Sequence, residues 1–78
     1  GKPLTIGRVP PADIVVRDPT LSRTHARFEL KEGDVWVEDA GSTNGIYING
    51  ERLDEAPVVA GDEIIIGKYH LVLVHGDG

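Results

Sequence analysis

Short apolar runs, cut at close intervals by turn-forming residues, are the feature of this 78-residue chain that most restricts its fold. No segment repeats its apolar residues every three or four positions, as an amphipathic helix would. The runs "LTI", "IVV" and "VWV" are instead separated by segments such as "GRVPPAD" and "KEGD". This pattern predicts about seven or eight short, mostly antiparallel strands arranged as an all-β sandwich.

Two hairpins can be predicted, the second of them with its register. Alternation from His25 to Leu30 places Ala26, Phe28 and Leu30 on one face of a strand, which turns through "KEGD" into "VWVE". Further along, "IYI" and "ERL" flank Asn49-Gly50, two residues that accept the positive φ of a tight hairpin turn.

The second hairpin also predicts side-chain neighbours. Its register sets Ile46 opposite Leu53 and Tyr47 opposite Arg52. We expect the Tyr47 ring and the Arg52 guanidinium to stack on the exposed side, which is worth about 0.5 kcal/mol.

Length and composition limit the organisation of the chain. It is short enough to be one domain, residues 1–78, and we expect it to be a piece of a longer protein because it lacks an initial methionine. It contains no cysteine, no targeting leader and no apolar run of membrane-spanning length, which predicts a soluble, cytoplasmic, monomeric domain without membrane contact. Its first strand starts so early that an edge partner is expected to be missing.

Charge is distributed unevenly. The first 28 residues hold five basic and two acidic residues, a net charge of +3, whereas the other 50 hold three basic and eleven acidic residues, a net charge of -8. An acidic chain of this kind is a poor candidate for a broad basic nucleic-acid surface. A small cationic region in its first third suits a compact anion.

Three segments between the expected strands are rich in hydrogen-bond donors: Gly7 to Asp13, Arg17 to Thr24 and Asp39 to Asn44. Loops on a rigid sandwich commonly carry function. Their guanidinium, hydroxyl and amide groups suit a phosphate or carboxylate, with an amide to hold a backbone alongside. The donors are Arg8, Arg23, Ser22, Ser42, Thr43 and Asn44.

An enzyme is the first alternative. Ser22, His25 and Asp39 contain the residue types of a hydrolase triad, but Ser22 and His25 are three apart at a strand entrance, so their side chains could meet only if the loop folds back. Around Ser42 the G-x-S-x-G pattern is absent. The segment "GDEIIIGKY" departs from a phosphate-binding P-loop by one extra residue between its glycines and by a tyrosine where Ser or Thr is required. We expect no catalysis and no cofactor.

A metal site is also disfavoured. The histidines are His25, His70 and His75; the first is 45 residues from the second, and the last two are expected on opposite faces of one strand. We expect His25 to be a structural histidine.

Four segments, taken in order, resemble one family. "TIGR", "LSRTHARF", "DAGSTNGIYING" and "GDEIIIG" are similar to the motifs of the forkhead-associated (FHA) domain, and the resemblance runs from Leu4 to Val74. It implies an eleven-stranded β-sandwich that binds phosphothreonine peptides through loops at one end. The family usually has one or two strands before the "TIGR" segment, where this chain begins.

The resemblance also implies roles for individual residues. Arg8, Ser22, Arg23 and Thr43 would contact the phosphate, and Asn44 would bind the peptide main chain. Supporting positions would be Gly7, His25, Ser42 and Gly45. The loop "GSTNG" would therefore serve recognition, with Asn49-Gly50 only the turn of its hairpin.

The partner implied is a protein phosphorylated by a Ser/Thr kinase. Selectivity around the phosphothreonine is expected to depend on Thr20, Leu21 and the stretch Asp54 to Ala56. The remaining alternative is a module that ignores phosphate and pairs with its partner through a sheet face or a free edge.

Overall fold

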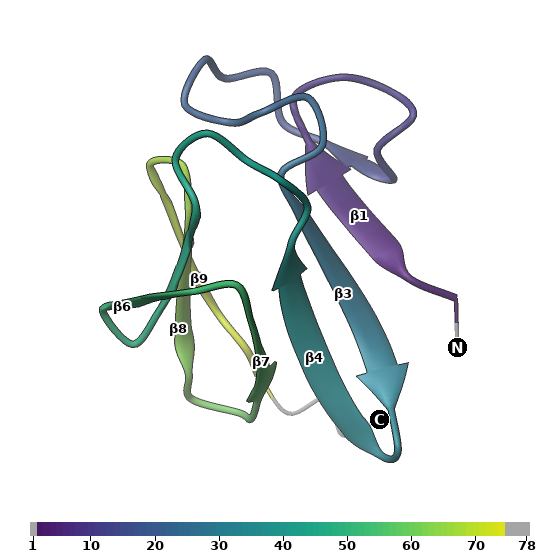
Figure 1. Ribbon diagram of the computed structural model, residues 1–78, viewed down its shortest axis with the longest axis vertical. Coiled ribbons are helices and arrows are strands. Elements are labelled where there is room, and N and C mark those ends of the chain that lie inside the picture. The colour runs from purple at the N-terminus through teal and green to yellow at the C-terminus, as the bar shows by residue number, and fades with distance from the viewer. Residues whose placement is uncertain (1, 75–78) are drawn as a thin grey trace.

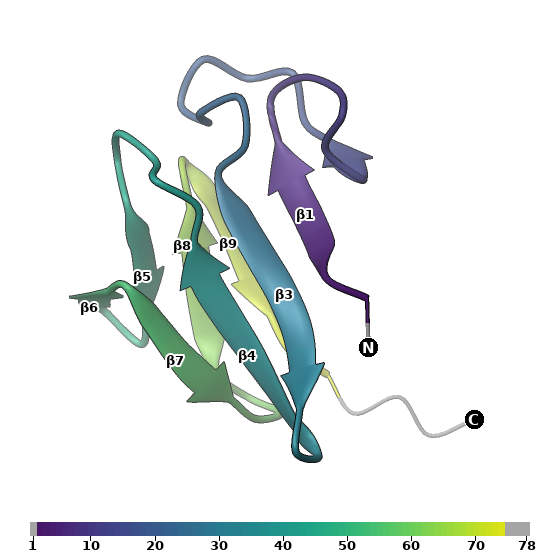
Figure 2. The ribbon, with the colours of Figure 1, turned by 45° about the vertical axis from the view of Figure 1, so that its right-hand side comes forward.

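Two β-sheets pack face to face in the computed structural model, which describes residues 2–74 (Figures 1 and 2). One sheet has the strand order β2-β1-β3-β4-β7 and the other β6-β5-β8-β9. The all-β sandwich predicted from the sequence is therefore confirmed. The strands are β1 (Leu4–Gly7), β2 (Ile14–Val15), β3 (Ala26–Lys31), β4 (Asp34–Asp39), β5 (Ile46–Ile48), β6 (Glu51–Leu53), β7 (Glu55–Val58), β8 (Glu63–Ile66) and β9 (Tyr69–Val72).

Both predicted hairpins form, and the second has the expected register. β3 and β4 pair from Ala26 opposite Asp39 to Lys31 opposite Asp34, around a turn whose two central residues both have positive φ. In the second hairpin, β5 pairs with β6 and the turn residues Asn49 and Gly50 have φ values of 52° and 87°. Ile46 faces Leu53 and Tyr47 faces Arg52, as expected.

The core lies between the sheets and is built mainly from β-branched residues. Ile46 and Ile66 from one sheet and Val37 from the other have no exposed surface, and Ile64 is 2% exposed. Full burial of an isoleucine or valine side chain stabilises a fold by about 1.5–3 kcal/mol. Leu21, from the loop between β2 and β3, joins this cluster, so the packing of the core also fixes the middle of that loop.

One strand was not foreseen. β7 forms the edge of the larger sheet beside β4, with Pro57 opposite Trp36. Proline has no N–H to give to a sheet and is tolerated at such an edge. Residues 2–74 thus contain nine strands, compared with the seven or eight expected from the pattern and the eleven implied by the resemblance.

Two expectations were wrong. β1 has neighbours on both sides, because it pairs in parallel with β2 and antiparallel with β3, and so it is not a free edge. The Tyr47–Arg52 stack does not form: the cation–π contacts of the described residues are Lys31 over Trp36 and Lys68 over Tyr69. The Arg52 guanidinium lies instead against the backbone at Gly45.

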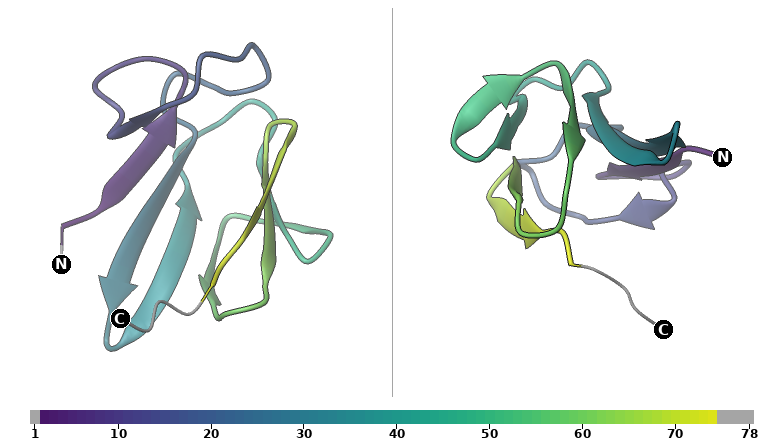
Figure 3. Two further views of the ribbon diagram at one scale, coloured as in Figure 1. Left: turned by 180° about the vertical axis from the view of Figure 1, so that it is seen from behind. Right: turned by 90° about the horizontal axis from the view of Figure 1, so that it is seen from below.

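The arrangement of β1, β3 and β4 brings three loops to one end of the molecule. Because β3 runs antiparallel to both β1 and β4, the end of β1, the start of β3 and the end of β4 are neighbours. The loops β1–β2, β2–β3 and β4–β5 therefore gather at the top of Figure 1, while the β3–β4 turn lies at the far end, as the reverse view also shows (Figure 3). No helix that could cross a membrane occurs in residues 2–74, and His75 lies outside this range.

Candidate functional site

Arg8 is fixed in place by the loop that follows β2. Its backbone N–H donates to the carbonyl oxygens of Ser22 and Arg23, both at 3.0 Å. Its side-chain Nε donates to the Leu21 carbonyl at 3.1 Å. Nε is thereby occupied, and the two terminal nitrogens of the guanidinium remain available for a ligand.

The close contact between β1 and the β2–β3 loop depends on Gly7. A Cβ atom at this position would lie 2.0 Å from the carbonyl oxygen of Arg23 and 2.9 Å from the Cα of Thr24. Only glycine permits this approach without moving the backbone. Gly7 therefore sets the distance between Arg8 and the segment that carries Ser22.

His25 connects the β2–β3 loop with the β4–β5 loop. Its ring is fully buried; Nδ1 accepts a hydrogen bond from the Ser22 N–H at 3.1 Å, and Nε2 lies 2.8 Å from the Gly45 carbonyl oxygen. Since Nδ1 accepts, the hydrogen belongs on Nε2, which donates to Gly45. The neutral imidazole thus joins the two loops beneath the surface.

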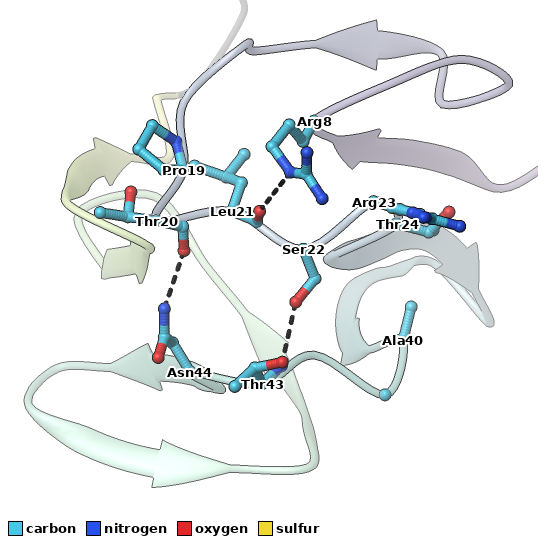
Figure 4. A pocket seen from close by; sticks show the side chains of 11 residues that line it. Arg8, Pro19, Thr20, Leu21, Ser22, Arg23, Thr24, Ala40, Thr43 and Asn44 are labelled. Carbon is cyan, nitrogen blue, oxygen red and sulfur yellow. Dashed lines mark hydrogen bonds between the residues drawn. The ribbon is translucent and has the colours of Figure 1, made fainter.

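The same two loops are also bonded to each other at the surface. The Thr43 N–H donates to Ser22 Oγ at 3.0 Å, and Asn44 Nδ2 donates to the Thr20 carbonyl oxygen at 3.0 Å (Figure 4). These bonds border a hollow of about 560 Å³. Its lining includes Arg8, Pro19 to Thr24, Ala40, Gly41, Thr43 and Asn44.

All five residues expected to contact a ligand line this one hollow, although they come from three loops. The four supporting positions do not line it. Ser42 bonds within its own loop: its N–H donates to Asp39 Oδ1, and its Oγ accepts from the Gly45 N–H. Gly45 has a φ of 79° and is buried beside Arg52, so it shapes the turn below the hollow.

The expected selectivity positions face the hollow to different extents. The Leu21 side chain is only 3% exposed and packs in the core, so it offers its carbonyl rather than its side chain to this end of the molecule. Asp54 to Ala56 leads into the edge strand β7 and does not line the hollow. Thr20 does line it.

The geometry argues against a hydrolase triad. Both ring nitrogens of His25 are bonded to backbone groups of Ser22 and Gly45, so neither can activate a serine hydroxyl. The Asp39 carboxylate accepts from the Ser42 N–H. Within residues 2–74, no three His, Asp or Glu side chains come together as a metal site would require.

We did not predict from the sequence the network of hydrogen bonds that surrounds Asp18. Its nearly buried carboxylate accepts from the Thr20 Oγ1 at 2.6 Å, the Thr20 N–H at 2.9 Å, Lys68 Nζ at 2.9 Å and the Tyr69 hydroxyl at 3.2 Å. The Lys68 N–H also donates to Thr20 Oγ1. The network ties the β2–β3 loop to the β8–β9 turn and fixes Thr20 next to Asn44.

The bonds between Asp18 and Thr20 could have been predicted from the sequence. An aspartate two residues before a threonine commonly accepts from that residue's N–H and hydroxyl in a tight turn. The other half joins Asp18 to residues some fifty positions later, which no local pattern indicates. The bonds from Thr20, and then the one from Lys68, hold the pKa of Asp18 well below its ordinary value. The same carboxylate raises the pKa of Lys68.

Stability should depend on the charge of Asp18. Because its pKa is depressed in the folded state, the ionised carboxylate stabilises the fold above the ordinary carboxyl range, near pH 4, and this contribution is lost as the pH falls through the lower folded-state value. Asp18→Asn should therefore lower the melting temperature at pH 7, by a difference that shrinks below about pH 4.

Circular-dichroism melting curves at several pH values would measure this difference. Asp34→Asn, at the exposed start of β4, is the matched control and should change the melting temperature little. Equal melting temperatures for Asp18→Asn and the unmodified chain at pH 7 would contradict the prediction.

Comparisons of the sequence and of the structure with known proteins point to the same family. The family model for the FHA domain matches residues 4–67. The glycogen accumulation regulator GarA of Mycolicibacterium smegmatis is 49% identical over 70 residues, which cover 90% of this chain and 44% of that protein. The chain thus spans less than half the length of that curated relative.

Solved structures agree with the family match. The FHA domain of the CT664 protein from Chlamydia trachomatis superposes with a TM-score of 0.91 at 31% identity, covering 99% of this chain and 80% of that one. A second structure, from a structural and functional analysis of phosphothreonine-dependent FHA domain interactions, gives a TM-score of 0.88 at 25% identity. It covers 96% of this chain and 78% of that chain.

Proposed function

This chain belongs to the FHA domain family, and we propose from that premise that it binds a phosphothreonine peptide in the hollow bordered by Arg8, Ser22 and Asn44. FHA domains are interaction modules, and the similar GarA protein is named as a regulator. The observation that carries the proposal is the convergence of five donor residues from three loops on one hollow.

The phosphate would lie between Arg8, Ser22, Arg23 and Thr43. Arg8 offers its two terminal guanidinium nitrogens, a planar pair that matches two phosphate oxygens. Ser22 Oγ already accepts from the Thr43 N–H, so its own hydrogen can be donated to the ligand. Arg23 is exposed and supplies a second positive charge.

Asn44 would hold the peptide main chain beside the phosphothreonine. One hydrogen of its side-chain amide is donated to the Thr20 carbonyl, which fixes the orientation of the amide group. Its second hydrogen and its carbonyl oxygen remain, and these can pair with a C=O and an N–H of an extended peptide. Asn44 thus supplies binding that does not depend on the phosphate.

The hydrogen bonds to the phosphate determine whether the peptide binds at all. A phosphothreonine carries a charge of about -1.5 to -2 near neutral pH. Each well-formed hydrogen bond to such a group contributes roughly 1.5–3 kcal/mol. Three or four of them offset the entropy lost on association, whereas the Asn44 contacts alone do not.

We also propose that residues 1–78 act as one recognition module within a longer protein. The chain covers 44% of the GarA sequence, so relatives carry additional segments beside the matching region. The partner would be a protein phosphorylated on threonine by a Ser/Thr kinase, bound as a peptide, with no catalysis in this domain.

Calorimetry with three forms of one peptide tests the proposal. The phosphothreonine form should bind at least about 100-fold more tightly than the unphosphorylated form, because loss of two charged hydrogen bonds costs about 3 kcal/mol or more. The phosphoserine form shows whether the threonine methyl group contributes. A degenerate peptide library avoids dependence on one flanking sequence. Equal affinity for phosphorylated and unphosphorylated libraries would overturn the proposal.

A further inference from the structure

Both acidic residues in the first third of the chain are bonded to groups other than arginine. Asp13 Oδ2 accepts from the Thr5 N–H at 2.9 Å and from Thr5 Oγ1 at 3.1 Å. Asp18 accepts from Thr20, Lys68 and the Tyr69 hydroxyl. The two carboxylates are therefore bonded to these partners and not to an arginine.

The arginines nearby are left without a carboxylate. Arg27 is the exception, since its Nε lies 2.8 Å from Glu38 Oε1. Among residues 2–74, Arg8, Arg17 and Arg23 form no ion pair with any Asp or Glu. The proposed phosphate neutralises Arg8 and Arg23. It leaves the charge of Arg17 uncompensated.

A second hollow adjoins the first at Arg8. It has a volume of about 280 Å³ and is lined by Arg8, Val9, Arg17, Asp18 and Pro19. Arg8 and Pro19 belong to the lining of both hollows, so a ligand in the first passes close to the second. Asp18 borders the second hollow, but its carboxylate is engaged by four donors.

We propose that Arg17, in the hollow that adjoins the first at Arg8, forms a second anion subsite that takes an acidic group of the same peptide. The group is a carboxylate side chain or a second phosphate, and both present oxygen pairs to a guanidinium. This inference rests on the proposed function, because the phosphothreonine is what places the second acid beside Arg17. The ligand class is thereby narrowed to phosphothreonine peptides with an additional negative charge near the phosphorylated residue.

Charge distribution favours an acid on a short peptide over an extended polyanion. The 50 residues after Phe28 carry a net charge of -8 and repel a polyanion that reaches beyond the loops. An acid carried by the phosphopeptide itself has a high effective concentration at the second hollow once the phosphothreonine is bound. The second acid therefore adds to the affinity that the phosphothreonine already provides.

An acidic scan of the peptide tests the inference. The starting ligand is a short phosphothreonine peptide with neutral flanking residues, and one aspartate is moved through each flanking position. At least one position should raise the affinity of the unmodified chain by about twofold to fivefold at low salt, the range of an exposed arginine–carboxylate pair. Phosphoserine at the best position then distinguishes a second phosphate from a carboxylate by the size of the gain.

Two charge-matched variants assign the effect. Arg17→Gln should abolish the gain from the acid and change the affinity for the neutral phosphopeptide by less than about twofold. Lys31→Gln removes the same charge next to the distant β3–β4 turn and should preserve the gain.

The outcomes separate the two proposals. A neutral phosphopeptide that binds, with no acidic position improving it or with a gain that survives Arg17→Gln, overturns the second subsite alone. If no phosphothreonine peptide binds better than its unphosphorylated form, the proposed function fails and the second subsite fails with it. A gain lost equally in Lys31→Gln would also overturn the assignment to Arg17, because it would reflect overall charge.

Discussion

Replacing Arg8 by alanine is expected to weaken phosphothreonine binding by at least about 100-fold. The guanidinium is held by its Nε bond to the Leu21 carbonyl, so its two terminal nitrogens are oriented before a ligand arrives. Losing two hydrogen bonds to a charged phosphate costs about 3 kcal/mol or more, and each 1.4 kcal/mol corresponds to a factor of ten. Calorimetry with the phosphothreonine library would measure the loss.

Two further variants make the Arg8 result specific. Arg8→Lys keeps the charge but cannot present a planar pair of donors, so it should retain binding that is weaker by about tenfold. Lys31→Ala, at the opposite end of the sheet, should bind normally. Melting curves for each variant show whether loss of the Leu21 contact also affects folding. A folded Arg8→Ala variant with unchanged affinity would favour a partner that pairs through a sheet face or edge.

Gly7→Ala is expected to have the largest effect on stability. The added Cβ would lie 2.0 Å from the Arg23 carbonyl oxygen, a backbone atom that can move only with the β2–β3 loop. Forcing atoms into a packed interior costs about 1–3 kcal/mol, and a clash with backbone lies at or beyond the upper end of that range. Small domains have little stability to lose, so we expect a substantial unfolded fraction at 37 °C.

Urea unfolding followed by circular dichroism would measure the free energy of unfolding of Gly7→Ala. The matched control is Gly33→Ala in the β3–β4 turn, where φ is +84° and no other atom lies within 4 Å of the added Cβ. It should lose only about 1 kcal/mol, the cost of a left-handed backbone for alanine. If both variants unfold at the same urea concentration, the close approach at Gly7 does not stabilise the fold as we infer.

The parts of the fold that follow from local pattern were predictable. Asn49-Gly50 fixes both the turn and the register of its hairpin, because both residues accept positive φ. The edge strand β7 was not predicted because Pro57 interrupts the strand pattern. Only the structure shows that β7 pairs with β4 at the edge of the sheet, where a proline without an N–H is tolerated.

The sequence predicted which donor residues would gather at one end of the sandwich, but not the contacts that hold them there. Ordered motifs identified Arg8, Ser22 and Asn44, and the antiparallel arrangement of β1, β3 and β4 then brought their loops together. Contacts between residues far apart in sequence could not be predicted from the sequence alone. The ion pair of Asp18 with Lys68 depends on how the β2–β3 loop packs against the β8–β9 turn.

The hydrogen bonds between the β2–β3 and β4–β5 loops have a kinetic consequence. Ser22 with Thr43, Thr20 with Asn44, and His25 beneath them hold the two loops together in the absence of a ligand. Encounter with a peptide then requires no slow rearrangement of the protein, so association rates should be similar for strong and weak ligands. Under the proposed function, differences between ligands would be found in their residence times, and dissociation would be the step that distinguishes one peptide from another.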